Sequence, residues 1–152
     1  DWSSDVCSSD LGPSGKSLTE NGDLHFSLSH CGYYAAAIVS SSQKVGIDFE
    51  QIQTRILTLR KKFLRPEEEL LLTQNIHGEA EAYTFGWAIK EAIYKWNGEG
   101  IVDFRQHMII ESIRHKSNMW IATCRFLKNS NEKIMVSGFP VDGHILAYAM
   151  SS

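Results

Sequence analysis

The sequence predicts an α+β fold in which an antiparallel sheet packs against a long helix. Three observations favour this class: short apolar–polar alternations near the start of the chain, a helical block in its middle, and further alternating segments towards its end. Strands grouped before and after a block of helices are typical of α+β domains with antiparallel sheets. The 152 residues, 43% of them hydrophobic, suit one domain with a core of its own.

The first predicted strands follow from the pattern of apolar residues. Residues 24–30 alternate between apolar and polar side chains, residues 33–39 form an alanine-rich apolar run, and residues 45–50 alternate again. Because the three segments follow one another closely along the chain, we expect them to be antiparallel neighbours.

The middle of the chain predicts three helices and its end predicts four strands. Residues 54–63 have a helical pattern, Pro66 fits the first turn of a helix that runs to residue 75, and residues 79–96 give the longest helical pattern. Gly98 and Gly100 end that helix. Connections rich in Lys, Ser, Asn, Pro and Gly separate the four segments that we predict as strands, residues 108–113, 120–127, 134–138 and 145–150.

Composition argues against several classes of function. A net charge of −3 offers no electrostatic surface for nucleic acid. The sequence contains no run of about eighteen apolar residues and no signal peptide at its start, so we expect no membrane span and a cytoplasmic location. The three cysteines are widely spaced, which suits reduced thiols better than a disulfide framework or a zinc site.

Residues 1–11, DWSSDVCSSDL, have no apolar periodicity. They resemble a translated sequencing adapter, and we expect them to be non-native. The native sequence is then expected to begin near Gly12, inside a gene whose start is lost.

Two carboxylates stand two residues apart in the segment VGIDFE. Side chains at this spacing share one face of a strand, so Asp48 and Glu50 should point one way while Ile47 and Phe49 point to the core. Neighbouring like charges repel each other unless a cation or solvent receives them, and Mg²⁺ prefers carboxylate oxygens. Taken alone, the pattern is more typical of a solvent-facing strand. Gly46 indicates close approach of another backbone or of a ligand.

The segment WAIKEAIYK places Glu91 and Lys95 four residues apart, and therefore on one face of the long helix. Taken alone, they are more typical of an exposed ion pair. The functional alternative has Glu91 facing a metal ion and Lys95 facing a phosphate.

The segment HFSLSH places Ser29 next to His30 on a strand. The two side chains should point to opposite faces, which argues against a nucleophile and base pair. A lone histidine is usually structural, although with a neighbouring hydroxyl it could bind a phosphate.

Together, these motifs and their order resemble the 4′-phosphopantetheinyl transferases, specifically the longer pseudo-dimeric, surfactin-synthetase-activating type. GID-x-E followed by WxxKEAxxK is a two-part pattern that chance seldom produces. The resemblance covers roughly residues 12–152 and implies an N-terminally truncated chain, with the end of the first lobe and the whole second lobe. It rests on Gly15-Lys16, HFSLSH, VGIDFE, Phe63 with Glu67 downstream, and WAIKEAIYK.

The resemblance implies an enzyme that uses Mg²⁺ to transfer 4′-phosphopantetheine from coenzyme A to a serine of an acyl or peptidyl carrier protein, giving holo-carrier and 3′,5′-ADP. The carrier would dock around residues 96–105. Two alternatives stay open. One is a catalytically incomplete module that binds carrier protein or metal, and the other is a different Mg²⁺-dependent phosphotransferase or phosphohydrolase.

The resemblance also assigns roles to residues. The Mg²⁺ ligands would be Asp48, Glu50 and Glu91. Lys95 would contact the diphosphate of coenzyme A, with Lys90 as a further candidate. His30 matches the histidine that contacts the 3′-phosphate, and Ser29 and Lys16 are further phosphate contacts. Catalysis would rest on Glu91 and Lys95, with Glu67 as a weaker candidate for the base.

Overall fold

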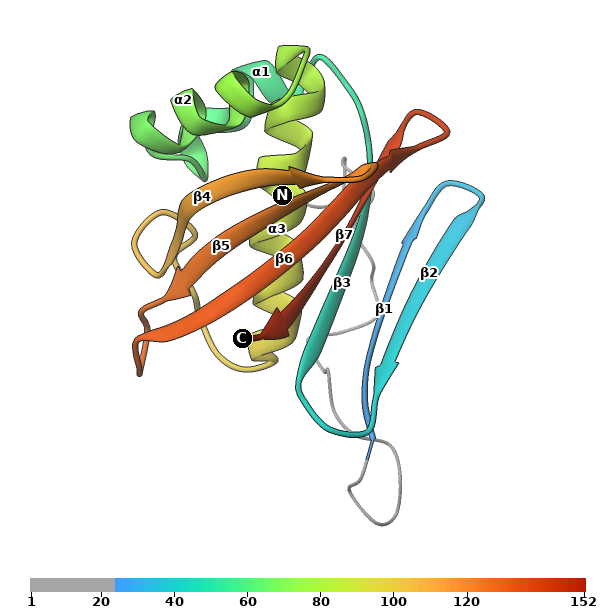
Figure 1. Cartoon of the computed structure of the whole chain (residues 1–152), viewed down its shortest axis with the longest axis vertical. Coiled ribbons are helices and arrows are strands. Elements are labelled where there is room, and N and C mark those ends of the chain that lie inside the picture. The colour runs from blue at the N-terminus through green and yellow to red at the C-terminus, as the bar shows by residue number, and fades with distance from the viewer. Residues whose placement is uncertain (1–23) are drawn as a thin grey trace.

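Helix α3 packs against one face of a five-stranded antiparallel sheet, and a two-stranded hairpin lies along the edge of that sheet (Figure 1). The computed structural model describes residues 24–152. The α+β prediction is confirmed. The elements, in chain order, are β1 (His25–Cys31), β2 (Tyr34–Ser40), β3 (Val45–Gln51), α1 (Ile56–Leu59), the 3-10 helix η2 (Arg60–Lys62), α2 (Pro66–Asn75), α3 (Glu79–Asn97), β4 (Met108–Lys116), β5 (Met119–Phe126), β6 (Glu132–Val141) and β7 (His144–Ser151).

The larger sheet has the strand order β3-β7-β6-β5-β4. Strands β4 to β7 form successive antiparallel hairpins, and β7 then pairs with β3 from the other side of the helical block. The turn between β6 and β7 is Asp142-Gly143, whose φ angles of 47° and 71° are both positive. Positive φ at both central residues matches the right-handed twist of a hairpin, and Asp-Gly is a preferred pair for such a turn.

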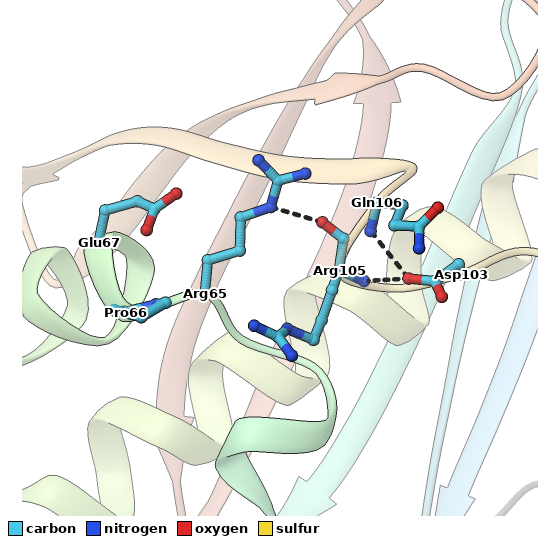
Figure 2. A pocket seen from close by; sticks show the side chains of 6 residues that line it. All are labelled: Arg65, Pro66, Glu67, Asp103, Arg105 and Gln106. Carbon is cyan, nitrogen blue, oxygen red and sulfur yellow. Dashed lines mark hydrogen bonds between the residues drawn. The ribbon is translucent and has the colours of Figure 1, made fainter.

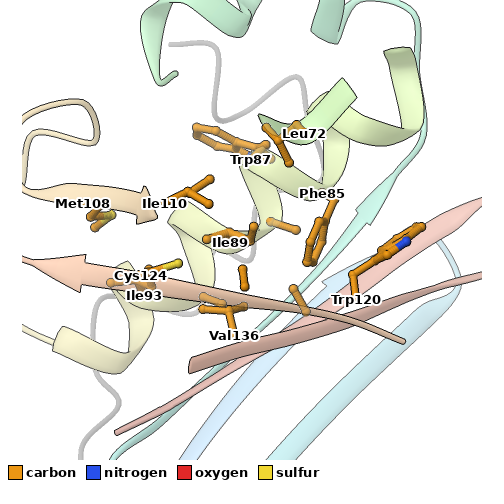
Figure 3. Packing of buried hydrophobic residues seen from close by; sticks show 14 of the residues in the cluster. Leu72, Phe85, Trp87, Ile89, Ile93, Met108, Ile110, Trp120, Cys124 and Val136 are labelled. Carbon is orange, nitrogen blue, oxygen red and sulfur yellow. The ribbon is translucent and has the colours of Figure 1, made fainter. Parts of the chain in front are cut away.

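Helix α3 supplies the centre of the core. Its apolar residues Phe85, Ala88, Ile89, Ala92 and Trp96 are all buried. The helix packs against β3, β7 and β6, and Figure 3 shows Phe85 and Ile89 among the packed side chains. Fully burying one large apolar side chain stabilises the fold by roughly 1.5 to 3 kcal/mol. The helix ends where predicted, because a left-handed glycine, φ 73°, follows its last turn.

The first predicted helix is shorter than expected. Residues 56–59 form one α-helical turn that continues as the 3-10 turn η2. Ile56 is the one buried residue of that turn, and no side chain caps its N-terminus. Without a buried apolar stripe or a cap, a longer helix gains little stability in water.

The expectation that the first three strands are antiparallel neighbours is only partly confirmed. β1 pairs with β2, but β3 pairs with β7 in the other sheet. β1 still lies along the outer edge of β3, where the hydroxyl oxygens of Ser27 and Ser29 accept the backbone N–H groups of Ile47 and Phe49, each at 3.0 Å. Serine side chains thus take the place of a backbone ladder between β1 and β3.

Three further expectations concern cysteines, membranes and the start of the chain. Cys124 is a free buried thiol, as expected, but Cys31 is disulfide-bonded, so the expectation of reduced thiols is wrong for that residue. No helix in residues 24–152 is long and apolar enough to cross a membrane. Residues 1–11 and Lys16 lie outside the described residues.

Candidate functional site

Strand β3 and helix α3 approach each other closely at Gly46. A Cβ atom added there would lie 2.0 Å from the carbonyl oxygen of Ala92 and 2.5 Å from the backbone nitrogen of Trp96. Only a residue without a side chain fits, so the glycine marks the close backbone approach that its position in the strand indicates. Because side chains alternate along a strand, Asp48 and Glu50 share this face and point towards α3.

The two strand carboxylates are buried, in contrast to the solvent-facing strand that the alternation alone favours. Asp48 is 2% exposed and Glu50 is 3% exposed. Ile47 and Phe49 are buried as well, but against the β1–β2 hairpin rather than in the core around α3, because the helix covers the carboxylate face. The ring of Phe49 lies 5.5 Å from that of Tyr34 in β2.

Each strand carboxylate is held through one of its oxygens. Asp48 Oδ1 accepts hydrogen bonds from Lys95 Nζ at 3.0 Å and from Ser29 Oγ at 3.3 Å. Glu50 Oε1 accepts one from Trp87 Nε1 at 3.1 Å. The second oxygens, Asp48 Oδ2 and Glu50 Oε2, are buried and have no hydrogen-bond partner within the described part of the chain. Buried polar atoms without partners are costly, so such a pair indicates a place for a ligand.

The charges of three carboxylates act on one another at this place. Burial, together with the charge of Asp48, raises the pKa of Glu91 to about 8, while the charge of Lys95 opposes the shift. Burial also raises the pKa of Glu50 well above its usual value, and Asp48 and Glu91 add to the effect. Glu91 is therefore close enough to β3 for its charge to raise the pKa of Glu50, and for the charge of Asp48 to raise its own pKa.

The predicted convergence of Asp48, Glu50 and Glu91 on one point is not seen at the spacing of metal ligands. Across residues 24–152, no three His, Cys, Asp or Glu side chains are close enough together to hold a metal ion as they stand. What the structure does bring together is two adjacent buried carboxylates and the charge of a third. Their role as Mg²⁺ ligands stays a prediction.

Lys90 is not available to a phosphate, and its interpretation as a diphosphate contact is wrong for this structure. Its side chain is fully buried, and its ammonium group donates to Glu68 Oε1 at 2.8 Å, to the carbonyl oxygen of Phe104 at 3.0 Å and to that of Met108. An ammonium group has three N–H donors, so all are engaged. Burial lowers the pKa of Lys90, and the charge of Glu68 opposes that shift.

The hydroxyl of Ser29 is also engaged inside the protein. Ser29 is 2% exposed, accepts the N–H of Phe49 and donates to Asp48, so its interpretation as a phosphate contact is contradicted. Its neighbour His30 is exposed, and the two residues point to opposite faces of β1, as predicted. The phosphate role of His30 stays a prediction, and Lys16 falls outside the described residues.

The sequence interpretation gave no role to Trp87, which contacts the site, or to Glu68, which holds Lys90 away from it. A signal for Trp87 was present, because Trp87, Glu91 and Lys95 follow one another at intervals of four and so form one stripe along α3. Glu68 had no such signal. Its partners Lys90 and the backbone N–H of Ile110 come from distant parts of the chain.

A pocket of about 420 Å³ lies between the start of α2 and the loop before β4 (Figure 2). Arg65 Nε donates to the carbonyl oxygen of Arg105 at 2.6 Å, and Asp103 Oδ1 accepts the backbone N–H of Arg105 at 2.9 Å. Glu67, the weaker candidate for the base, is exposed and lines this pocket. Arg105 lies at the end of the segment where the resemblance places carrier docking, which also stays a prediction.

Known proteins resemble this chain in sequence. A model of the 4′-phosphopantetheinyl transferase superfamily matches residues 44–149. The chain is also similar to a 4′-phosphopantetheinyl transferase from Bacillus subtilis and to 4′-phosphopantetheinyl transferase Sfp from Bacillus subtilis strain 168, each 30% identical over 80 residues. Those 80 residues are 52% of this chain and 35% of each relative, so the chain matches about a third of their length. Because the family match covers more than half of the chain and includes β3, α3 and most of β7, the protein belongs to the 4′-phosphopantetheinyl transferase superfamily.

Proposed function

We propose that this protein transfers 4′-phosphopantetheine from coenzyme A to a serine of an acyl or peptidyl carrier protein, with Mg²⁺, in the cytoplasm. One observation carries the proposal: Asp48 and Glu50 each present an unpaired buried oxygen on the face of β3 that meets α3. In a member of this superfamily, that face also receives the charge of Glu91 and the ammonium group of Lys95.

The donor set fits a hard divalent cation. Mg²⁺ prefers carboxylate oxygens together with phosphate and water, and Asp48 Oδ2 and Glu50 Oε2 are oxygens of that kind without another partner. We propose these two residues and Glu91 as its ligands. When bound, the cation would offset negative charge on the diphosphate of coenzyme A as the leaving group departs.

Lys95 and Glu91 supply the chemistry of the chain itself. The side chain of Lys95 is 16% exposed, so its ammonium group can serve Asp48 and still meet a phosphate from solvent. The carrier serine oxygen forms a bond to the β-phosphorus of coenzyme A, and the bond from that phosphorus to 3′,5′-ADP breaks. The serine proton passes to the carboxylate of Glu91, which must be ionised to accept it, as it would be beside a bound cation.

The test is an intact-mass measurement on an apo carrier protein incubated with this chain, coenzyme A and Mg²⁺. We expect a gain of one phosphopantetheine, which Asp48→Asn should reduce by roughly 10²-fold because it weakens the hold on the cation. Glu111→Gln is the matched control, since Glu111 forms an exposed pair with Arg125 on β5 and should leave the rate unchanged.

Other outcomes would overturn the proposal. Carrier binding without a mass gain would indicate a binding module. Release of inorganic phosphate would indicate a phosphohydrolase. Equal rates for Asp48→Asn and Glu111→Gln would remove the carboxylate face from the mechanism.

A further inference from the structure

We infer that Trp87 and Ser29 are positioning residues, each of which fixes one oxygen of a strand carboxylate so that the other oxygen is presented to the cation. The inference rests on the proposed function, since it concerns the same site. It goes beyond the ligand set, because neither residue would touch the metal ion or a substrate.

The indole of Trp87 is held rigidly enough to orient Glu50. Its ring is 6% exposed and packs against Phe63 and Phe104, with ring centroids 5.1 and 5.4 Å away. The position of its N–H group is therefore set by the core. A glutamate has several rotatable bonds, and the hydrogen bond from Trp87 Nε1 to Oε1 selects the rotamer in which Oε2 remains unpaired.

Ser29, on β1 at the outer edge of β3, does the same for Asp48. Its oxygen accepts the N–H of Phe49 at 3.0 Å, and its own O–H donates to Asp48 Oδ1 at 3.3 Å. The first bond anchors the hydroxyl to the strand that carries the carboxylate. Lys95 donates to the same oxygen, so both protein donors lie on Oδ1 and Oδ2 is left for a ligand.

The same pattern holds for both carboxylates of β3, although their donors come from different elements, Ser29 from β1 and Trp87 from α3. One oxygen of each carboxylate takes the protein's donors, and the other is buried without a partner among the described residues. Ligating groups in metal sites are commonly held by such outer partners, which fix the orientation of the ligand. The arrangement is therefore what two ligands of one cation require.

The chain contains a matched control for each positioning residue. Trp96 lies on the same helix, is 3% exposed and donates its indole N–H to Ser151 Oγ at 3.2 Å. Ser27 lies on the same strand, is 4% exposed and accepts the N–H of Ile47 at 3.0 Å. Both controls make the same kinds of bond at similar burial, but their recorded bonds do not go to a carboxylate.

The experiment measures Mn²⁺ binding by electron paramagnetic resonance on the whole chain, with Mn²⁺ as the probe for Mg²⁺. We expect Trp87→Phe and Ser29→Ala each to weaken Mn²⁺ affinity by about 10- to 100-fold. Trp96→Phe and Ser27→Ala should change it by less than about 2-fold. Ser29→Thr keeps the hydroxyl and should restore affinity, which a purely structural role would not require.

The outcomes separate this inference from the proposed function. If the unchanged protein bound no Mn²⁺, the metal site itself would be wrong. If it bound Mn²⁺ and all four variants bound it equally, the metal site would stand and the positioning role would be wrong. Should Trp87→Phe fail to fold, the comparison of Ser29→Ala with Ser27→Ala decides alone, since each variant loses one acceptor for a backbone N–H of β3.

Discussion

Helix α3 carries two lysines five residues apart, and each pairs with a carboxylate from another element in a different way. Lys90 meets Glu68 of α2 at 2.8 Å, and both side chains are fully buried. Lys95 meets Asp48 of β3 at 3.0 Å, with the lysine side chain 16% exposed and the aspartate side chain 3% exposed. The two pairs have similar N···O distances, but they differ in whether a carboxylate oxygen remains without a hydrogen-bond partner.

Both carboxylate oxygens of Glu68 accept hydrogen bonds. Its Oε1 accepts from Lys90 and from the backbone N–H of Ile110, and its Oε2 accepts from the backbone N–H of Arg65. The pair thereby joins α2, α3 and β4. At the other pair, Asp48 and its neighbour Glu50 each retain an unpaired buried oxygen. A saturated pair maintains the architecture, whereas an unsaturated one costs stability that only a ligand returns.

The largest expected effect comes from breaking the saturated pair. Lys90→Ala should lower the free energy of unfolding by about 3 to 5 kcal/mol, because it leaves the charge of Glu68 buried without its partner. Urea titration followed by circular dichroism measures the change. Arg125→Ala is the control, since its pair with Glu111 is exposed, 39% and 38%, and should contribute less than about 1 kcal/mol. Similar losses for both variants would contradict the comparison.

The same contrast explains which parts of the site the sequence could predict. Alternation along β3 placed Asp48 and Glu50 on one face, and helical spacing placed Glu91 and Lys95 on one face, because both rules are local. Burial of the strand carboxylates is not local. It depends on the approach of α3 at Gly46 and on the pairing of β3 with β7.

The incorrect assignments have the same cause. Lys90 directly precedes Glu91 in the sequence. Nothing in the adjacent residues shows that Glu68 and the carbonyl groups of Phe104 and Met108 enclose its ammonium group. Ser29 is assigned to a phosphate by its motif, but β1 turns out to lie against β3. The fold class and the limits of α2 and α3 could be predicted from the sequence, because apolar periodicity, Pro66 and Gly98 are local signals.

A second effect is expected from the pH dependence of the carboxylate face. The pKa of Glu91 is raised to about 8 in the folded protein, while an unfolded glutamate ionises near its usual value of about 4.5. Between these values the folded state binds more protons than the unfolded state. Stability is therefore fully present at low pH and falls as the pH rises through this window. Urea titrations without divalent cations should show this slope.

Glu91→Gln isolates the contribution of this group. The variant cannot ionise at this position, so its stability should fall less steeply than that of the unchanged protein between pH of about 5 and about 8. Added Mg²⁺ should also flatten the slope of the unchanged protein, because it binds the ionised carboxylates. A steeper loss in Glu91→Gln, or a rise of stability with pH that the variant abolishes, would show that the glutamate is not held in the way described.

The smallest effect on stability is expected at the unsaturated pair. Lys95→Ala should lower the free energy of unfolding by about 1 to 2 kcal/mol, less than Lys90→Ala, since the lysine is partly exposed and Ser29 still donates to the buried Asp48. It should lower the rate of phosphopantetheine transfer by roughly 10²-fold, the order found when one charge-stabilising donor is removed.

Lys95→Ala has a second readout that does not depend on activity. The charge of Lys95 lowers the pKa of both Glu91 and Glu50, so its removal should move the protonation of these groups to still higher pH, as measured by carboxyl infrared absorption. Lys44→Ala is the control, because that lysine lies over the ring of Trp96 and is not among the charges that shift either glutamate. If Lys95→Ala instead destabilised the protein as much as Lys90→Ala and left the turnover of the folded fraction normal, both lysines would be structural. The difference between the Lys90–Glu68 pair and the Lys95–Asp48 pair would then have no bearing on function.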